Sequence, residues 1–316
     1  MPKLVHTGSV IIDQVMVVPS LPEPGGDVVA TSAEDTVGGG FNTIVASVRD
    51  GLPVRYAGLL GTGDRAAQVR RALAEYEVEI AVPPATERDT GFCVAIVDAS
   101  AERTFYTYVG AEGLENYGHL AQVRVDPDDL VYVTGYSFAS EENADALARW
   151  LPELPAGTTV LVDPSPLIGD LPTDQVELLL TAATIFSPNG RETRLLGERE
   201  DFSEAVRVLR DRLPEKTALV ARDGNRGAWV SASAADPGRW VPAFAVEAVD
   251  TNGAGDAHTG VLLAALSRGQ TLVEAVERAN AAAALAVTKS GPATSPTGAE
   301  IDRFLQVGTR KPVPSA

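Results

Sequence analysis

Short apolar runs alternate with helical patterns along most of this 316-residue chain. Each run is rich in Val, Ile or Leu, and most are followed by Gly, Asp, Pro or Ser, which is the pattern of a buried strand. The runs occupy residues 4–10, 54–60, 131–134, 160–162, 184–186 and 218–221. Between them, apolar residues recur at helical spacing, as Val206, Leu209 and Leu213 do. Strands that alternate with helices predict a three-layer α/β fold, in which helices flank a central, mostly parallel sheet.

Two segments depart from this alternation. Residues 92–97 and 104–109 are both strand-like and predict an antiparallel hairpin. A segment near the N-terminus holds short Val-rich runs that Pro and Gly interrupt. We interpret the two together as a small β-sheet lid, built from residues 13–40 and 85–112, on a single domain that spans residues 1–316. The alternative is a pair of ordinary surface hairpins.

The charge balance excludes some classes of partner. The chain has 43 acidic and 26 basic residues, so its formal net charge is −17. Nucleic acids and anionic membranes attract proteins through a basic face, so we expect neither to be a partner. A local nest of backbone N–H groups can still bind a phosphorylated ligand in an acidic protein.

Cysteine, histidine and apolar patterns bear on metal sites and compartment. Cys93 is the single cysteine, so no disulfide forms within the chain. The three histidines lie far apart and show no metal-ligand spacing. No apolar stretch approaches the ~20 residues that span a bilayer, and the first residues lack the apolar core and cleavage site of a secretory signal. We therefore expect a cytoplasmic protein.

The segment 250–260, with the sequence DTNGAGDAHTG, carries the strongest chemical signal. A turn of small residues opens onto an apolar pattern that predicts a helix, so the N–H groups at the helix start can bind an anion. Asp256 lies at the same helix start, where a carboxylate would weaken phosphate binding unless it had another task. Taking a proton from an attacking hydroxyl is such a task. The alternative is that Asp256 merely caps a core helix.

This segment resembles the C-terminal signature of the ribokinase-like (PfkB) family of carbohydrate kinases. Further motifs are similar to those of the family and follow the family's order; they are Gly38-Gly39-Gly40-Phe41-Asn42 with Ala46, Ser187–Glu192, Asp223–Gly227, and Asn280 with Lys289–Gly291. On the residues alone, Asn189 and Glu192 are equally consistent with a helix capping box. The turn 224–227 is equally consistent with a plain hairpin.

The resemblance implies phosphorylation of a hydroxyl on a sugar or sugar-containing small molecule, with ATP and Mg²⁺ as cofactors. It assigns catalysis to Asp256 as general base and to the backbone of Gly253, Ala254 and Gly255. It assigns the acceptor to Asp13, Gly38, Gly39, Gly40 and Asn42, and the nucleotide to Asn189, Arg222, Gly224, Gly227 and Asn280. Glu192 would hold Mg²⁺, partly through water. A K⁺ site would be formed by Asp250, Asn252, Ala286, Lys289, Gly291 and Ser295, and two chains would form a homodimer through the lid.

Departures from the family pattern bear on the substrate. Arg222 stands where the family usually has Thr, and Ile11 stands where ribokinases proper have Asn. The glycine motif has Phe41 and no lysine, and we interpret Ile11 and Phe41 as having replaced, or as lying close to, hydrogen-bonding positions. Losing a hydrogen-bonding group typically costs about 1–3 kcal/mol for each buried hydroxyl left unpaired. We therefore predict that free ribose is not the best acceptor and that an unphosphorylated ligand with an apolar part or a different hydroxyl pattern is preferred. A nucleoside kinase of the same family is the alternative.

Two other functions compete with a kinase. Residues 61–66, GTGDRA, fit a dinucleotide-binding fingerprint, which makes an NAD-dependent dehydrogenase one alternative. The next strand-like run, however, ends without an acidic residue to bind ribose hydroxyls. A non-catalytic sugar sensor is the second alternative. Such a sensor would be expected to lose the base or the anion-binding glycines, and this chain has both.

His258 adjoins Asp256 in the sequence and might suggest a catalytic pair. Successive helical residues point about 100° apart, so we interpret His258 as a pocket or core side chain.

Overall fold

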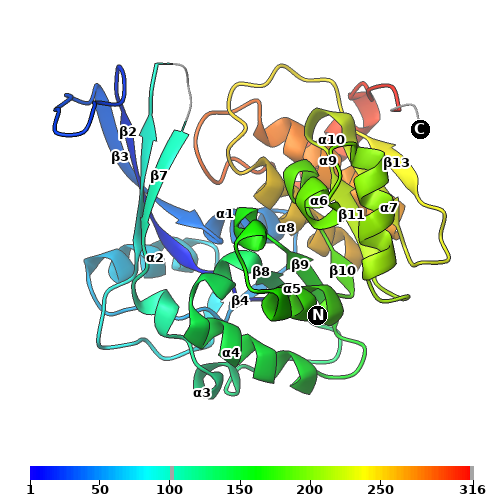
Figure 1. Ribbon diagram of the computed structural model, residues 1–316, viewed down its shortest axis with the longest axis horizontal. Coiled ribbons are helices and arrows are strands. Elements are labelled where there is room, and N and C mark those ends of the chain that lie inside the picture. The colour runs from blue at the N-terminus through cyan, green and yellow to red at the C-terminus, as the bar shows by residue number, and fades with distance from the viewer. Residues whose placement is uncertain (100–102, 314–316) are drawn as a thin grey trace.

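The computed structural model describes residues 1–99 and 103–313. Its centre is a nine-stranded sheet in the order β13-β12-β11-β10-β9-β8-β1-β4-β5, which is parallel from β11 to β5 (Figure 1). Strands β12 and β13 each run antiparallel to the strand before them. The strands are β1 (Leu4–His6), β4 (Val54–Tyr56), β5 (Glu79–Ile80), β8 (Leu130–Thr134), β9 (Thr159–Asp163), β10 (Ile185–Phe186), β11 (Ala218–Arg222), β12 (Gly227–Ser231) and β13 (Arg239–Pro242).

Helices cover both faces of this sheet and confirm the three-layer fold (Figure 1). One face packs against α3 (Tyr117–Leu120), α4 (Glu141–Trp150), α5 (Thr173–Ala182), α6 (Gly190–Gly197) and α7 (Phe202–Arg212). The other packs against α1 (Phe41–Arg49), α2 (Asp64–Glu75), α8 (Ala254–Ser267) and α9 (Leu272–Ala286), and α10 (Gly298–Val307) packs on α8 and α9. Short 3₁₀ helices lie at Ala111–Leu114, Gly135–Ala139, Leu151–Glu153, Pro166–Gly169 and Gly224–Arg226. In the part of the chain that is described, no helix combines the length and apolarity needed to cross a membrane.

Strand β8 shows why the central strands are continuously apolar. Its side chains alternate between two hydrophobic clusters, with Leu130 and Tyr132 on one face and Val131 and Val133 on the other. A parallel sheet that is covered by helices on both faces requires apolar side chains in both directions. The apolar runs in the sequence are therefore the signal of the buried sheet itself.

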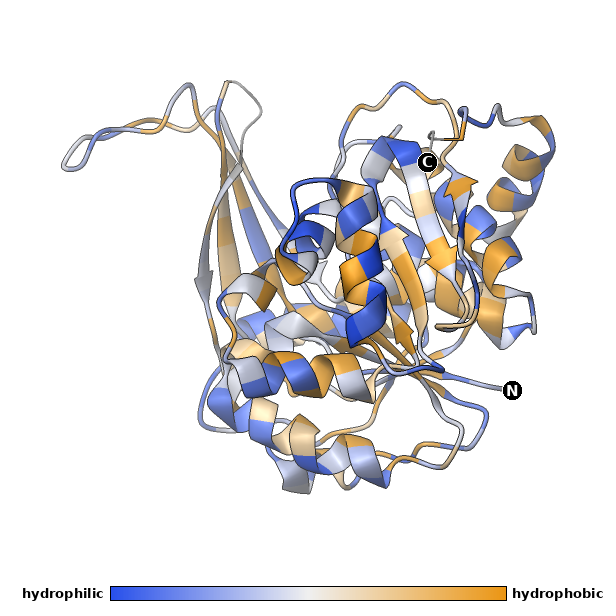
Figure 2. Ribbon diagram, turned by 45° about the vertical axis from the view of Figure 1, so that its right-hand side comes forward, coloured by the Kyte–Doolittle hydropathy of each residue, from blue (hydrophilic) through white to orange (hydrophobic). Residues whose placement is uncertain are grey.

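A second, four-stranded sheet projects from the α/β body, in the order β3-β2-β6-β7 (Figures 1 and 2). Its strands are β2 (Val10–Val17), β3 (Ser32–Gly39), β6 (Phe92–Val97) and β7 (Arg103–Tyr108). β6 and β7 pair antiparallel, as the hairpin pattern predicted, and β2 joins them by running parallel to β6. The mostly exposed connection between β2 and β3 extends away from the body (Figure 2).

The prediction of one strand over residues 4–10 is wrong. β1 ends at His6 in the central sheet, and β2 begins at Val10 in the small sheet. Gly8 lies at this junction, where a Cβ would come within 3.0 Å of both His6 Cε1 and Thr134 Cγ2. The chain therefore changes sheets at Thr7, Gly8 and Ser9, a short segment of turn-forming residues between apolar residues that are buried on both sides of it. The run over residues 54–60 likewise leaves the sheet early, after Tyr56.

An ion-pair cluster with a buried centre at Asp50 and Arg278 joins four helices. Asp50, which follows α1, accepts a hydrogen bond from Arg268 Nη2 at 2.7 Å and from Arg278 Nη2 at 2.5 Å. Arg278 of α9 also pairs with Asp302 of α10 at 2.5 Å. Its hydrogen bonds to Asp50 raise the pKa of the Arg278 guanidinium further above its ordinary value. The cluster fixes α1 against α8, α9 and α10.

Candidate active site

The carboxyl ends of the parallel strands meet at one edge of the central sheet. The strand order reverses between β1 and β8, because the chain builds β4 and β5 on one side and β9 to β11 on the other. Such a switch point is where open α/β sheets bind ligands. Asp163 ends β9, Asn189 follows β10 and Arg222 ends β11. The start of α8 reaches the same edge, where Arg222 Nη1 lies 3.4 Å from the carbonyl oxygen of Gly255.

Helix α8 begins without a side-chain cap. Gly253 precedes it with φ 71°, a left-handed conformation that favours glycine. The N–H of Ala254 makes only a long hydrogen bond, 3.4 Å, to the carbonyl of Thr251. By contrast, side chains cap the starts of α4, α6, α7, α9 and α10. The first turn of α8 therefore offers N–H groups and the positive end of its dipole to an anion.

The Asp256 carboxylate in this first turn is held by α1. Thr43 Oγ1 donates to Oδ1 at 3.0 Å, and Asn42 Nδ2 donates to Oδ2 at 3.3 Å. Gly260, one turn further along α8, makes the contact possible, because a Cβ there would lie 2.6 Å from both the Thr43 carbonyl and Ala46 Cβ. The alternative that Asp256 caps its own helix is wrong, since α8 has no side-chain cap.

The carboxyl groups of Asp256 and Asp13 both have raised pKa values. Burial raises the pKa of Asp256 and the charge of Asp163 adds to the shift, while the hydrogen bonds from Thr43 and Asn42 oppose it. Burial also raises the pKa of Asp13 to about 6, and the charge of Asp256 contributes. A carboxylate with a raised pKa is a stronger base for an attacking hydroxyl.

The predicted acceptor residues lie together with Asp256. A Cβ at Gly38 would lie 1.9 Å from Asp13 Oδ2, so glycine at this position of β3 leaves room for the carboxylate on β2. Gly39 has φ 61°, and Gly40 leads directly into α1. Asn42 Oδ1 accepts the N–H of Ala293 at 2.9 Å, so Asn42 also ties α1 to the loop that follows α9.

Phe41 does not face these residues. It is buried, and its ring packs edge-on against Tyr76 with the ring centroids 5.7 Å apart. The interpretation that Phe41 replaces a hydrogen-bonding group at the acceptor is therefore wrong. Ile11 pairs with Gly38, and it lies on the same side of β2 as Asp13 because alternate strand residues share a face.

Asn189 and Glu192 form a capping box at the start of α6, which was one of the two roles that the sequence allowed them. Asn189 Oδ1 accepts the N–H of Glu192 at 3.0 Å, and Glu192 Oε2 accepts the N–H of Asn189 at 2.7 Å. Burial raises the pKa of Glu192 to about 7, and the charge of Asp163 adds to the effect. Among residues 1–99 and 103–313, no group of three or more His, Cys, Asp or Glu side chains could enclose a metal ion. The buried Glu192 carboxylate could still hold Mg²⁺, which usually takes one or two carboxylates and completes its shell with phosphate and water.

Of the predicted nucleotide residues, Gly224 and Gly227 lie in the β11–β12 turn, and Asn280 lies on α9 beside β13. Gly227 has φ 103°, and a Cβ there would lie 2.2 Å from the carbonyl oxygen of Val241. Asn280 Nδ2 donates to the carbonyls of Val241 and Pro242 at 3.0 and 3.2 Å. Gly224 is exposed and left-handed, with φ 54°. The Asn280 amide group is thus engaged in holding β13 against α9.

The predicted K⁺ residues come from two loops that Asp250 joins. Its carboxylate accepts the N–H of Asn252 at 2.9 Å and that of Gly291 at 3.2 Å. The Ser295 hydroxyl is buried and has no hydrogen-bond partner among the described residues. Lys289 pairs with Glu300 at 3.9 Å, and the Ala286 carbonyl accepts the Thr294 hydroxyl at 3.2 Å. The Ser295 hydroxyl oxygen is therefore a ligand that a cation could use.

Thr43 and Asp163 contact the predicted site residues Asp256 and Arg222, but they are absent from the sequence-based assignment. Thr43 is 213 positions from the carboxylate that it contacts, and a threonine in a helical pattern carries no signal of its own. Asp163 could have been found, because it directly follows a strand-like run and the carboxyl ends of parallel strands line the ligand site. Its Oδ2 accepts Arg222 Nη2 at 2.9 Å.

The dinucleotide fingerprint has a different role. Asp89 occupies the start of α2, where its carboxylate accepts the N–H groups of Arg65 and Ala66 at 3.1 and 3.0 Å. A Cβ at Gly63 would lie 2.4 Å from Asp89 Cγ. A pyrophosphate would need these same N–H groups. The glycines therefore make room for Asp89, and the dehydrogenase interpretation is wrong.

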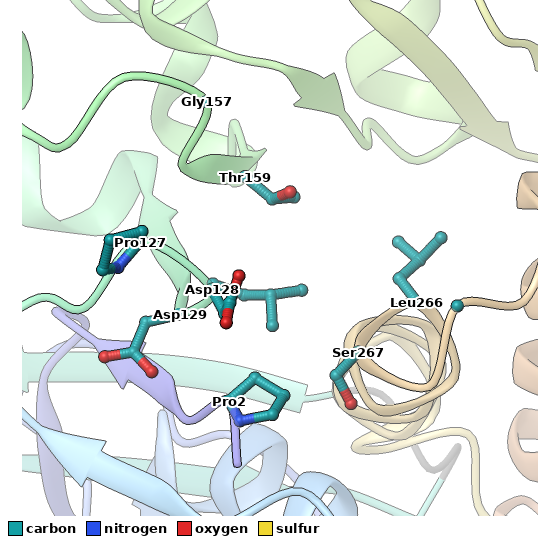
Figure 3. A pocket seen from close by; sticks show the side chains of 10 residues that line it. Pro2, Pro127, Asp128, Asp129, Gly157, Thr159, Leu266 and Ser267 are labelled. Carbon is teal, nitrogen blue, oxygen red and sulfur yellow. The ribbon is translucent and has the colours of Figure 1, made fainter.

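A cavity of about 440 Å³ lies at the opposite, amino-terminal edge of the sheet. Figure 3 shows Asp128, Thr159 and Leu266 around it. Its walls come from the starts of β8 and β9 and from the end of α8, far along α8 from Asp256. It contains none of the residues that converge at the carboxyl edge.

The fold and the site together define a phosphotransferase with an alcohol group as acceptor. The chain belongs to the pfkB family of carbohydrate kinases, whose family model matches residues 1–298. It is 34% identical over 297 residues to the uncharacterised sugar kinase YegV of Escherichia coli K12, covering 93% of this chain and 91% of that protein. It is 30% identical over 310 residues to the ATP-dependent ribose-1-phosphate kinase of Halopiger xanaduensis, covering 96% and 98%. Its fold matches Arabidopsis thaliana ribokinase, complexed with ribose and ATP, with a TM-score of 0.80 at 23% identity, covering 96% and 99%.

Proposed function

We propose that this protein uses ATP and Mg²⁺ to phosphorylate a hydroxyl on an unphosphorylated sugar or sugar-containing small molecule, with Asp256 as general base. The observation that carries the proposal is the Asp256 carboxylate, which α1 holds at the uncapped start of α8. A base and an anion site within one helical turn match the needs of phosphoryl transfer, which are positioning and charge stabilisation. A sugar sensor would need neither feature.

In the proposed reaction, Asp256 accepts the proton of the acceptor hydroxyl. The acceptor oxygen bonds to the γ-phosphorus of ATP as the bond from that phosphorus to the β–γ bridging oxygen breaks, which releases ADP. The N–H groups of Gly253, Ala254, Gly255 and Asp256 stabilise the charge on the transferred group. Asp13, Asn42 and the glycines 38–40 orient the acceptor, while Asn189, Gly224, Gly227 and Asn280 form the nucleotide side. Mg²⁺, held by Glu192 partly through water, would neutralise phosphate charge.

The small sheet is proposed to serve as the lid of a single domain. It carries Asp13, and it joins the body at the glycine motif, where β3 runs into α1. A lid in this position would exclude water from the transferred phosphoryl group.

Coupled measurement of ADP release across acceptors tests the proposed function. The panel holds pentoses, ketohexoses, sugar phosphates and nucleosides, and it includes ribose and ribose 1-phosphate because relatives use or bind them. We expect acceptor-dependent ADP release with one unphosphorylated class. No acceptor-dependent release with any class would contradict the kinase proposal. A clear preference for ribose would show that Ile11, which remains on the acceptor side of β2, does not determine specificity.

The first prediction for this site is that a bound monovalent cation raises its activity. Bound between the Asp250 and Ser295 loops, K⁺ would add positive field beside the start of α8. We expect higher kcat in potassium than in tetramethylammonium buffer of equal ionic strength. Ser295→Ala should reduce the difference, since it removes the buried hydroxyl that has no protein partner in the described chain. Equal rates in the two buffers would contradict the K⁺ site.

Dimerisation through the small sheet is the second prediction. β7 is an edge strand, and Phe105, Tyr106 and Tyr108 on it are 60%, 62% and 53% exposed. Exposed aromatic side chains on an unpaired edge mark an interaction surface. We expect sedimentation equilibrium to give a dimer that Tyr106→Glu dissociates. Val307→Glu, at an exposed site on α10, is the control and should leave the dimer intact.

A further inference from the structure

Arg222 brings a positive charge to the carboxylates at the carboxyl edge of the sheet. We propose that its guanidinium contacts the phosphoryl group during transfer and stabilises the charge on it, an inference that rests on the proposed kinase function. Asp163 is the positioning residue that holds the guanidinium in place. In this step the acceptor oxygen bonds to the γ-phosphorus, the bridging bond to ADP breaks, and charge spreads over the three equatorial oxygens.

The two edges of the guanidinium are bound very differently. Nη2 donates to Asp163 Oδ2 at 2.9 Å and to the carbonyl oxygen of Ser187 at 2.8 Å. Nη1 reaches only the carbonyl oxygen of Gly255, at 3.4 Å. Nε is buried and has no hydrogen-bond partner within the described chain. An arginine has five N–H donors, so one edge is anchored while the other keeps donors that an anion could use.

The loosely bound edge lies at the start of α8. A Cβ at Gly255 would lie 3.0 Å from Arg222 Nη1, so the guanidinium is in contact with the first turn that offers N–H groups to an anion. A charged donor beside uncharged backbone donors gives the stronger, shorter hydrogen bond to a phosphoryl oxygen. Glycine at position 255 leaves the guanidinium room to occupy this position.

The surrounding charges keep Arg222 a cation and keep it in place. Burial opposes its charge, but Asp163 and Glu192 outweigh that effect and raise the pKa of the guanidinium. Its side chain is only 12% exposed, so the charge is poorly screened by water. The threonine that the family resemblance places here is short and uncharged, so it could not supply this contact.

The competing explanation is that Arg222 only neutralises the nearby carboxylates. The two explanations differ in what happens when Asp163 is neutralised as well. If Arg222 merely balances Asp163, then Asp163→Asn should restore the activity that Arg222→Met removes. If Arg222 contacts the phosphoryl group, the double variant should be no more active than Arg222→Met alone.

The experiment measures kcat and KM for the wild type, Arg222→Met, Arg222→Lys, Asp163→Asn and the double variant, with folding checked by circular dichroism. We expect Arg222→Met to lower kcat by about 10²–10³-fold, the usual effect of losing one donor to a developing anion. KM for the acceptor should change little. Arg222→Lys keeps the positive charge and should recover part of the loss in kcat. If the Met variant does not fold, the Lys variant takes its place in the comparison with the wild type. Arg212→Met is the control and should match the wild type in kcat, because it removes a partly exposed ion pair to Glu177 and a hydrogen bond to the Leu196 carbonyl, both outside the proposed site.

Two results would overturn this role. One is a folded Arg222→Met protein with wild-type kcat, and the other is recovery of activity in the double variant. Neither can be confused with failure of the proposed function, which would appear as no acceptor-dependent ADP release by the wild type.

Discussion

Replacement of Asp256 by Asn is expected to lower kcat by about 10²–10⁴-fold, the usual contribution of a general base. Asparagine keeps the shape of the side chain and can still accept the Thr43 hydroxyl, so the contact between α1 and α8 should survive. It cannot take a proton from the acceptor. ATP should still bind, because the substitution removes a negative charge beside the anion site. Steady-state ADP release and isothermal titration with ATP measure the two effects.

The controls for this variant separate chemistry from folding. Asp126→Asn changes a surface carboxylate that pairs with Arg124, and it should match the wild type. The pH dependence of kcat/KM for the wild type is a second check. Because the pKa of Asp256 is raised, protonation of its carboxylate as the pH falls should remove the base and lower kcat/KM. The pKa of Asp13, about 6, places loss of an acceptor-binding carboxylate on the acid side as well. A folded Asp256→Asn protein with near wild-type turnover would show that the base lies elsewhere.

Replacement of Asp50 by Ala is expected to cost about 3–5 kcal/mol of unfolding free energy, because removing one partner of a buried ion pair leaves an uncompensated charge. Arg278 is 7% exposed and would lose the carboxylate that both its Nε and Nη2 contact. Arg268 would lose its ion pair too. Urea unfolding, followed by circular dichroism and extrapolated to zero denaturant, measures the loss.

Asp302→Ala is the matched control, since it removes the other carboxylate that pairs with the same arginine. The Asp302 side chain is 62% exposed, and exposed pairs contribute about 0–1 kcal/mol. We therefore expect a small loss from Asp302→Ala and a large one from Asp50→Ala. Similar losses from both variants would mean that burial does not set the strength of this cluster.

The sequence predicted the central sheet well because a sheet buried on both faces leaves apolar runs of the right length. It did not predict where β1 ends, because the apolar residues on either side of Thr7, Gly8 and Ser9 were joined into one strand, although glycine and serine are typical of a turn. Phe41 was misplaced for a related reason: a helix that starts at the acceptor residues also has a core face, and one motif holds residues of both faces. The local sequence pattern does not determine whether a given side chain faces the acceptor or the core.

The candidate site was predicted as separate motifs and not as an arrangement. Asp256, Asn42 and the glycines were identified from family resemblance, but nothing local links Thr43 to Asp256. That contact depends on how closely two helices approach, which side chains far apart in sequence decide. The capping box of Asn189 and Glu192, by contrast, joins residues only three positions apart, so the sequence alone was enough to predict it.

Gly260 lets α1 and α8 pack so closely that the two helices can be exchanged between relatives only together. With no Cβ between them, the helix proposed to position the acceptor and the helix that carries the proposed base are fitted to each other at Thr43 and Ala46. Transplanting the glycine motif and α1 from a relative with another acceptor preference would therefore bring in a helix shaped for a different neighbour. A working chimera of this protein has to exchange the facing side of α8 along with α1, although more than 200 residues of chain separate them.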